Sequence, residues 1–244
     1  GEMIFNSTTD KVEYWDGTKW YGITYEVIYP TSLKMYLDAS NTNSYPGTGT
    51  TWFDLTTNNN DGTISGATWN SGGYFDFDGS NDYVSIPSTA TEPFQASARA
   101  FTLSMWINRD STGFAPLITK YGSTSATRSW YYAINASGQL YMAWWNGSAL
   151  VNKTAASAIV NTTGVWYHIV LAVSPTSMDF YVQGVLKNFV GGSVTHTSGG
   201  NEPIVIGSQA GGQYNFFNGQ ISKTRIYDVT LTQAEITALY NEGR

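Results

Sequence analysis

The sequence predicts an all-β protein with a β meander at its N-terminus and one short helix at its C-terminus. Three observations support this fold class. Short apolar runs are separated by Gly, Asn, Asp, Ser and Pro, which favour turns. Several runs alternate apolar and polar residues, as half-buried antiparallel strands do. No helical periodicity occurs before about residue 232.

Residues 1–28 are predicted to form a separate three-stranded meander. Its strands are expected at residues 3–5, 12–15 and 19–23. A β segment of this size has too small a core to be stable alone. We therefore expect Tyr14, Trp15 and Trp20 to lie in an assembly contact, either with the main domain or with another chain.

Residues 29–244 are predicted to form the main β domain. Phe101–Ile107 alternates most clearly, with Phe101, Leu103 and Met105 on one face. The predicted strands are Lys34–Leu37, Tyr74–Asp78, Tyr83–Ile86, Phe101–Asn108, Pro116–Tyr121, Trp130–Asn135, Leu140–Trp145, Trp166–Ser174, Met178–Val182, Ile204–Ile206 and Phe217–Tyr227.

The C-terminal residues predict a helix of about ten residues. Thr232 and Glu235 have the spacing of a capping box, in which each side chain bonds the other residue's backbone N–H. Ile236, Leu239 and Tyr240 then form one apolar stripe.

The composition excludes several classes of protein. The 244 residues include no Cys, which rules out disulfides, thiol nucleophiles and zinc ribbons. Only 12% of the residues are charged, against roughly 25% in an average domain, and the net charge of -6 argues against nucleic-acid binding. No apolar run reaches the ~18 residues of a membrane span.

Several short segments of the main domain follow one another in a characteristic order. They are Leu33–Asp38, Trp52–Leu55, Asn58–Thr63, Phe75–Val84, Phe101–Trp106, Trp166–Val170, Phe180–Gly184 and Phe217–Ile221, followed by Ile226-Tyr227, Leu231-Thr232, Ala234–Ile236 and Tyr240-Asn241. This order resembles the concanavalin A-like lectin/glucanase superfamily, in its laminin-G-like or pentraxin-like branch. The resemblance implies a two-sheet antiparallel jelly-roll sandwich that binds glycans or proteins and often holds a structural Ca²⁺.

The segment from Met3 to Trp20 is similar to a short motif of bacteriophage structural and tail-fibre proteins. The laminin-G-like form of the residues that follow is also similar to modules of phage virion proteins. This resemblance implies a location on a virion surface, or an extracellular one, within a homo-oligomer or a larger assembly.

Two groups of acidic residues are candidates for the Ca²⁺ ligands. Asp38, Asp54 and Asp61 belong to one Asn- and Asp-rich region, and Asp78 and Asp82 belong to another. Ca²⁺ prefers six to eight oxygen ligands from flexible loops. The alternative is that these residues simply form turns, which Asn and Asp favour.

An aromatic surface is the candidate ligand site. If Leu140, Met142 and Trp144 face the core, the alternation of a strand turns Tyr141 and Trp145 outward. The predicted ligand-binding residues are Tyr141, Trp145, Asn146, Trp130 and Tyr132. Alternatively both sides of the sheet are buried, or the aromatic side is a protein–protein interface, where Tyr and Trp are enriched.

Catalysis is not expected. Retaining glycosidases of this fold need two carboxylates about 5–5.5 Å apart, and their Glu-x-Asp-x-x-Glu motif is missing. Asp76 and Asp78 are a general acid–base pair, two metal ligands or part of a turn. With His168 and His196 as the only histidines and no Gly-x-Ser-x-Gly, a serine-nucleophile site is also unsupported.

The sequence therefore predicts a non-catalytic, lectin-like module on a phage virion or other extracellular particle, adhering to surface glycans. The first alternative is a structural or decoration protein that assembles through its aromatic face and its meander. The second is a polysaccharide-degrading enzyme.

Overall fold

The computed structural model describes residues 2–6, 11–15, 17–18, 20–23, 30–88, 100–157, 159–191, 202–209, 212 and 214–244. The chain divides into two units, residues 1–30 and residues 31–244. The three strands predicted for the first unit are present: β1 (Glu2–Asn6), β2 (Lys11–Trp15) and β3 (Trp20–Ile23) pair antiparallel. Trp15 is the cross-strand partner of Trp20, but the side chains of Tyr14, Trp15 and Trp20 lie outside the described part of the structure.

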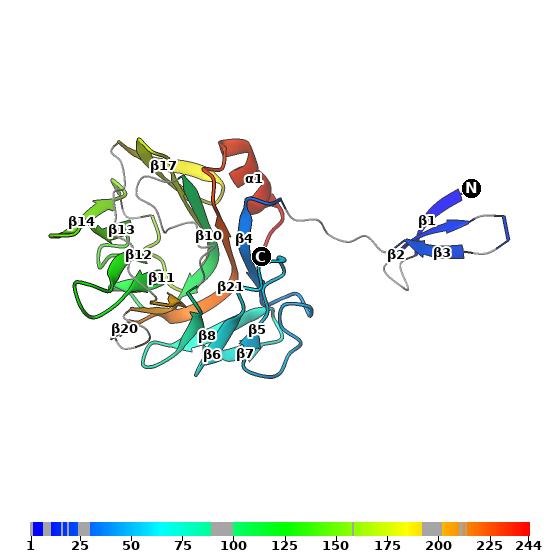
Figure 1. Ribbon diagram of the computed structural model, residues 1–244, viewed down its shortest axis with the longest axis horizontal. Helices are drawn as coiled ribbons and strands as arrows, with labels where there is room; N and C mark the ends of the chain where they lie inside the picture. The colour runs from blue at the N-terminus through cyan, green and yellow to red at the C-terminus, as the bar shows by residue number, and fades with distance from the viewer. Residues whose placement is uncertain are drawn as a thin grey trace. The chain divides into compact units, whose positions relative to one another are not determined.

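The second unit is a sandwich of two eight-stranded antiparallel sheets, as counted in its described residues (Figure 1). We call them sheet I and sheet II. In order, sheet I contains β17 (Val185–Gly191), β16 (Ser177–Val182), β15 (Trp166–Val173), β10 (Phe101–Arg109), β21 (Asn218–Tyr227), β8 (Tyr74–Asp78) and β7 (Thr68–Asn70), with β4 (Leu33–Asp38) also paired to β21.

Sheet II carries the candidate ligand site. Its strands, in order, are β14 (Leu150–Thr154), β13 (Leu140–Trp145), β12 (Arg128–Ile134), β11 (Ala115–Tyr121), β18 (Ile204–Ile206), β9 (Tyr83–Ile86), β6 (Gly62–Ser65) and β5 (Thr51–Trp52). A small hairpin of β19 (Ser208–Gln209) and β20 (Tyr214–Phe216) follows β18. The predicted fold class is therefore confirmed, although the short or edge strands β5, β6, β7, β14 and β17 were not predicted.

The core fills the space between the two sheets. Alternate residues of each strand point into it, as the pattern of Phe101–Ile107 predicted: Leu103 and Met105 are buried there. The largest completely buried apolar side chains in the core are aromatic, and they come from both sheets: Trp52, Trp130, Tyr132, Phe75, Phe101, Phe180 and Phe217.

The one helix in the described residues, α1 (Gln233–Asn241), packs against the outer face of sheet I. The Tyr240 ring stacks on Trp106 with centroids 5.9 Å apart and on His168 with centroids 6.1 Å apart. Just after the helix, Glu242 forms an ion pair with Arg225 of β21 at 2.5 Å. Stacked rings and a charge pair thus attach the helix to this face.

His168 has a structural role beneath the helix. Its Nε2 lies 2.9 Å from Ser104 Oγ, and the residue is almost completely buried. Burial, together with the nearby charges of Arg225 and Lys223, lowers the pKa of His168 to about 3. The imidazole is therefore neutral at ordinary pH, as expected for a packed core histidine.

The capping box makes a testable contribution to stability. Thr232 Oγ1 accepts from the Glu235 N–H, and Glu235 Oε2 accepts from the Thr232 N–H. We expect Thr232→Ala to lower the free energy of unfolding by about 1 kcal/mol, because an N-terminal donor loses its partner. Urea unfolding measures this change.

Thr57→Ala is the matched control, since Thr57 is also exposed and its hydroxyl forms no hydrogen bond with the described residues. Equal losses in the two variants would contradict a capping role for Thr232.

Candidate functional site

Strand β13 carries the first residues of the site. Leu140, Met142 and Trp144 are buried in the core, whereas Tyr141 and Trp145 are only partly buried. The predicted alternation is therefore confirmed, and Tyr141 and Trp145 lie on the outer face of sheet II.

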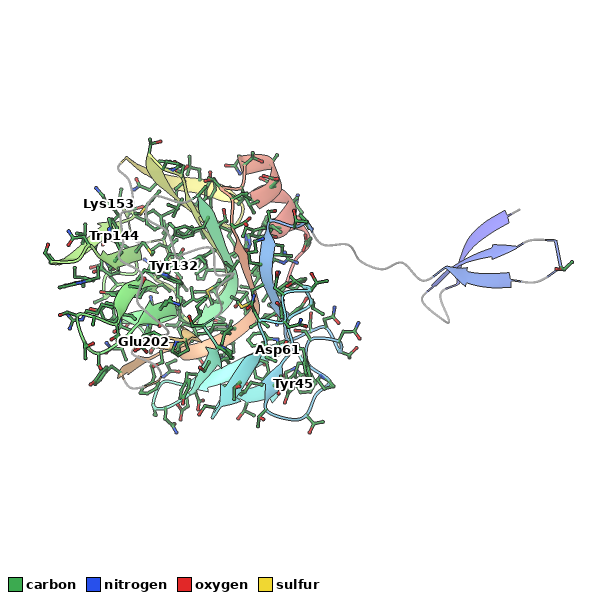
Figure 2. All side chains as sticks on the ribbon, in the orientation of Figure 1. Tyr45, Asp61, Tyr132, Trp144, Lys153 and Glu202 are labelled. Atoms are coloured by element: carbon green, nitrogen blue, oxygen red, sulfur yellow. The ribbon has the colours of Figure 1, made fainter. Side chains whose placement is uncertain are left out.

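Trp130 and Tyr132 do not lie on this face, which corrects the prediction from the sequence. Both side chains are fully buried in the core, and Figure 2 labels Tyr132 among the side chains of the second unit. The physical reason is the alternation of β12, which turns Tyr131 outward when its two neighbours point inward. Tyr131 is a further residue of this face, which the same period-two rule indicates.

The outward aromatic residues form a continuous row, in which Tyr131 is buried and Tyr121 and Tyr141 are partly exposed. The ring of Tyr131 lies 5.2 Å from that of Tyr121 in an edge-on arrangement and 5.7 Å from that of Tyr141. Small residues make room for them, because Ala133 and Ala143 occupy the neighbouring outward positions of β12 and β13. Edge-to-face and tilted rings at these distances attract one another.

Arg128 joins this row to Trp145. Its guanidinium carbon lies 5.6 Å from the centroid of the Tyr121 ring and 5.4 Å from that of the Trp145 ring. These distances are typical of cation–π contacts. We define Tyr121, Arg128, Tyr131, Tyr141 and Trp145 as the aromatic face.

A chain of hydrogen bonds holds the middle of the aromatic face. Asn215 Nδ2 donates to Gln209 Oε1 at 2.7 Å, and the Gln209 side chain is hydrogen-bonded to the Tyr131 hydroxyl. The hydroxyls of Tyr131 and Tyr141 lie 3.3 Å apart. Burial raises the pKa of Tyr131, and the contact with Tyr141 raises it further, so the phenol stays protonated. The hairpin β19–β20 thereby fixes the orientation of two rings on the face.

Asn146 follows Trp145 at the end of β13. Its Oδ1 accepts hydrogen bonds from the backbone N–H groups of Ser148 and Ala149. The carboxamide oxygen therefore closes a turn, and the exposed amide nitrogen is the part of Asn146 that can meet a ligand.

The aspartates predicted to hold Ca²⁺ occupy different places. Asp38 accepts hydrogen bonds from the Tyr36 hydroxyl and from Ser40. Asp54 accepts four, from the backbone N–H groups of Tyr36, Thr56 and Asn60 and from the Thr56 hydroxyl. These two carboxylates thus stabilise loops in the way that the turn alternative describes.

The other three aspartates form two contacts. Asp61 Oδ1 accepts from the Asp54 N–H, and Asp82 Oδ2 accepts from the Asp78 N–H. Burial, with the nearby charge of Asp78, raises the pKa of Asp82. Within the described residues, His, Cys, Asp and Glu side chains form no group of three suited to a metal. The Ca²⁺ site therefore stays a prediction.

Asp76 and Asp78 are the two carboxylates that the sequence offers as a general acid–base pair, as metal ligands or as part of a turn. Both lie on β8 in sheet I, where Asp78 Oδ1 accepts from the N–H groups of Ser80 and Asn81. This contact assigns Asp78 to the turn that follows β8.

The described residues contain no helix that has both the length and the apolar composition needed to cross a membrane.

The family follows from this fold and from a comparison of sequences. A laminin-G-type family model, described as the concanavalin A-like lectin/glucanases superfamily, matches residues 78–237. The match spans 160 of the 244 residues. The chain therefore belongs to this superfamily, as the order of its sequence segments predicted.

A curated relative has a similar sequence. The adhesion G-protein coupled receptor V1 of Danio rerio is 26% identical over 171 residues. The match covers 66% of this chain but only 3% of the receptor, so the chain corresponds to a small part of that relative.

Two solved structures share the fold. Domain 4 of AbnA, a GH43 extracellular arabinanase from Geobacillus stearothermophilus in complex with arabinotriose, has a TM-score of 0.64 at 17% identity. That match covers 86% of this chain and 98% of the domain. The Trypanosoma rangeli sialidase in complex with sialic acid has a TM-score of 0.62 at 18% identity, covering 87% of this chain and 33% of the sialidase.

Calcium binding is tested by stability. If Ca²⁺ binds the folded state, excess Ca²⁺ will raise the melting temperature above that measured with a chelator, because a ligand stabilises the state that it binds. Differential scanning calorimetry measures the shift, and elemental analysis counts the bound metal. Asp82→Asn will abolish the shift, whereas the control Asp76→Asn will keep it; identical melts of the wild type with calcium and with chelator would reject the site.

Proposed function

We propose that the chain is a non-catalytic, lectin-like module that binds glycans through the aromatic face of sheet II. The observation that carries this proposal is the row of outward rings from Tyr141 to Trp145, with Arg128 among them. Aromatic rings can pack against the apolar faces of sugar rings, while nearby hydroxyl, amide and guanidinium groups can bond the sugar hydroxyls.

The comparisons support a carbohydrate ligand in a general way. The family name includes lectins, and the two solved structures are complexes with arabinotriose and with sialic acid. The superfamily also includes glucanases. The five residues of the aromatic face include no carboxylate, so they offer no acid–base pair for hydrolysis. This observation favours binding over the polysaccharide-degrading alternative.

An extracellular or particle-surface location completes the proposal. It is supported by the laminin-G-type family match and by the similarity to an adhesion receptor. The virion surface of a phage is the particular setting that we infer from the N-terminal segment, Met3 to Trp20, which is similar to a motif of phage tail-fibre proteins.

The glycan proposal predicts a specific loss. We expect Trp145→Ala to weaken glycan binding at least tenfold. The sugar rings lose a stacking surface, and Arg128 loses one of its two supporting rings. A glycan array identifies the ligand, and isothermal titration calorimetry measures the affinity.

Trp166→Ala is the control. Trp166 is also partly buried and lies beneath an arginine, Arg244, but it belongs to sheet I. If both variants bind as the wild type does, the aromatic face is not the site.

Assembly is the second candidate function. It is favoured by the division of the chain into two units, of which the first is a three-stranded sheet that pairs Trp15 with Trp20. So small a sheet needs another surface to cover its apolar residues.

The assembly candidate predicts self-association of the full chain. We expect sedimentation to give a mass above the 26.7 kDa of one chain, or a mass that rises with concentration. Tryptophan fluorescence of Trp15→Phe and Trp20→Phe will locate the contact if it involves the meander. A strict monomer at all concentrations would contradict self-assembly and leave glycan binding unaffected.

A further inference from the structure

Arg128 differs from the other buried or half-buried arginines in its partners. Arg225 forms an ion pair with Glu242, and Arg109 donates to the backbone carbonyls of Val160 and Gly113. Arg128, in contrast, makes no ion pair or side-chain hydrogen bond with the residues that the structure describes. Within the described part of the chain, the contacts of its guanidinium are with the rings of Tyr121 and Trp145.

These ring contacts leave the donors of Arg128 available. A guanidinium carries five N–H donors in a planar fork that matches a carboxylate, with two parallel hydrogen bonds. Contacts with Tyr121 and Trp145 fix the plane of this fork without neutralising its charge. The Nε atom is already shielded from water and has no partner. The terminal Nη groups are not among the buried atoms without a partner, so they are the donors that an anionic group can reach from solvent.

A second donor is oriented at the other end of the aromatic face. The side-chain oxygen of Gln209 accepts a hydrogen bond from Asn215, so its amide N–H group is the donor to the Tyr131 oxygen. The hydroxyls of Tyr131 and Tyr141 lie 3.3 Å apart, and either can be the donor. When Tyr131 donates, the O–H of Tyr141 remains available to an acceptor on a ligand.

We propose that the ligand is a saccharide bearing a carboxylate, and that this carboxylate binds the Arg128 guanidinium between Tyr121 and Trp145. The inference rests on the proposed glycan-binding function and names its substrate class. Sugar rings next to the acid pack along Tyr121 and Tyr141, the tyrosines of the face that are partly exposed, and a hydroxyl or ring oxygen accepts from Tyr141. The protein's net charge is -6, so its overall charge repels an acidic ligand. Any preference for such a ligand must therefore come from a local site.

Matched pairs of saccharides test the proposal. Sialyllactose is compared with lactose, and trigalacturonic acid with its methyl ester, by isothermal titration calorimetry of the full chain at pH 7. The first pair tests a carboxylate from a sialic acid (a nonulosonate), and the second pair tests a carboxylate from a uronic acid. At least one acidic member will bind roughly ten- to hundredfold more tightly than its neutral partner, the gain expected for hydrogen bonds between charged groups.

Variants assign the preference to one residue. Arg128→Gln will bring the acidic ligand down to the affinity of the neutral one, and Arg128→Lys, which keeps the charge but not the fork, will restore only part of the difference. Arg244→Gln is the matched control, because Arg244 also lies over two rings, Tyr74 and Trp166, but in sheet I. Circular dichroism melts establish that each variant is folded.

The outcomes separate this inference from the proposed function. If neutral and acidic saccharides bind equally, and Arg128→Gln changes neither, the acidic-ligand proposal is overturned while glycan binding stands. If the wild type binds no saccharide, the proposed function fails and the inference fails with it. If the wild-type preference survives in Arg128→Gln but is lost in Arg244→Gln, the carboxylate site lies elsewhere and the assignment to Arg128 is overturned.

Discussion

The alternation of β12 and β13 determines what each face of sheet II can be. The core between the sheets takes Trp130, Tyr132 and Trp144, which are among its largest side chains. Each is followed or preceded in the chain by another aromatic residue, which the pleat must turn outward. A shift of one residue in register would exchange the two sets and expose the core residues. The aromatic face is therefore a geometric consequence of how the core is packed.

The outer faces of the two sheets differ because only one is covered by the C-terminal helix. On sheet I, Tyr240 closes over Trp106 and His168, and Glu242 neutralises Arg225. Rings and charges on that side are thus satisfied within the chain. On sheet II, the rings of Tyr141 and Trp145 remain partly exposed, and among the described residues Arg128 contacts only rings. The same kinds of side chain stabilise the fold on one face and are available to a ligand on the other.

Local patterns allowed much of this to be predicted from the sequence. The alternation of Leu140–Trp145 and the capping box of Thr232 involve residues close in the chain, and both are confirmed. The edge strand β14 was missed because its pairing comes from β13 rather than from its own polar sequence. The partners of Arg128 were also missed, since Trp145 reaches it only through the pairing of β12 with β13. Asp54 illustrates a third limit: an aspartate that holds a loop has the same sequence signature as a metal ligand.

The scarcity of charge gives Arg128 its significance. With only 12 Lys and Arg residues in 244, each buried or half-buried cation has a large effect on the local potential. Lys34 and Arg225 are paired with carboxylates, and Arg109 is bound to carbonyl oxygens. An arginine held by Tyr121 and Trp145 keeps both its orientation and its charge, because rings fix its position but carry no formal charge. A carboxylate of the chain in place of these rings would have paired with the guanidinium, as Glu242 pairs with Arg225. It would thus have neutralised the charge that a ligand could recognise.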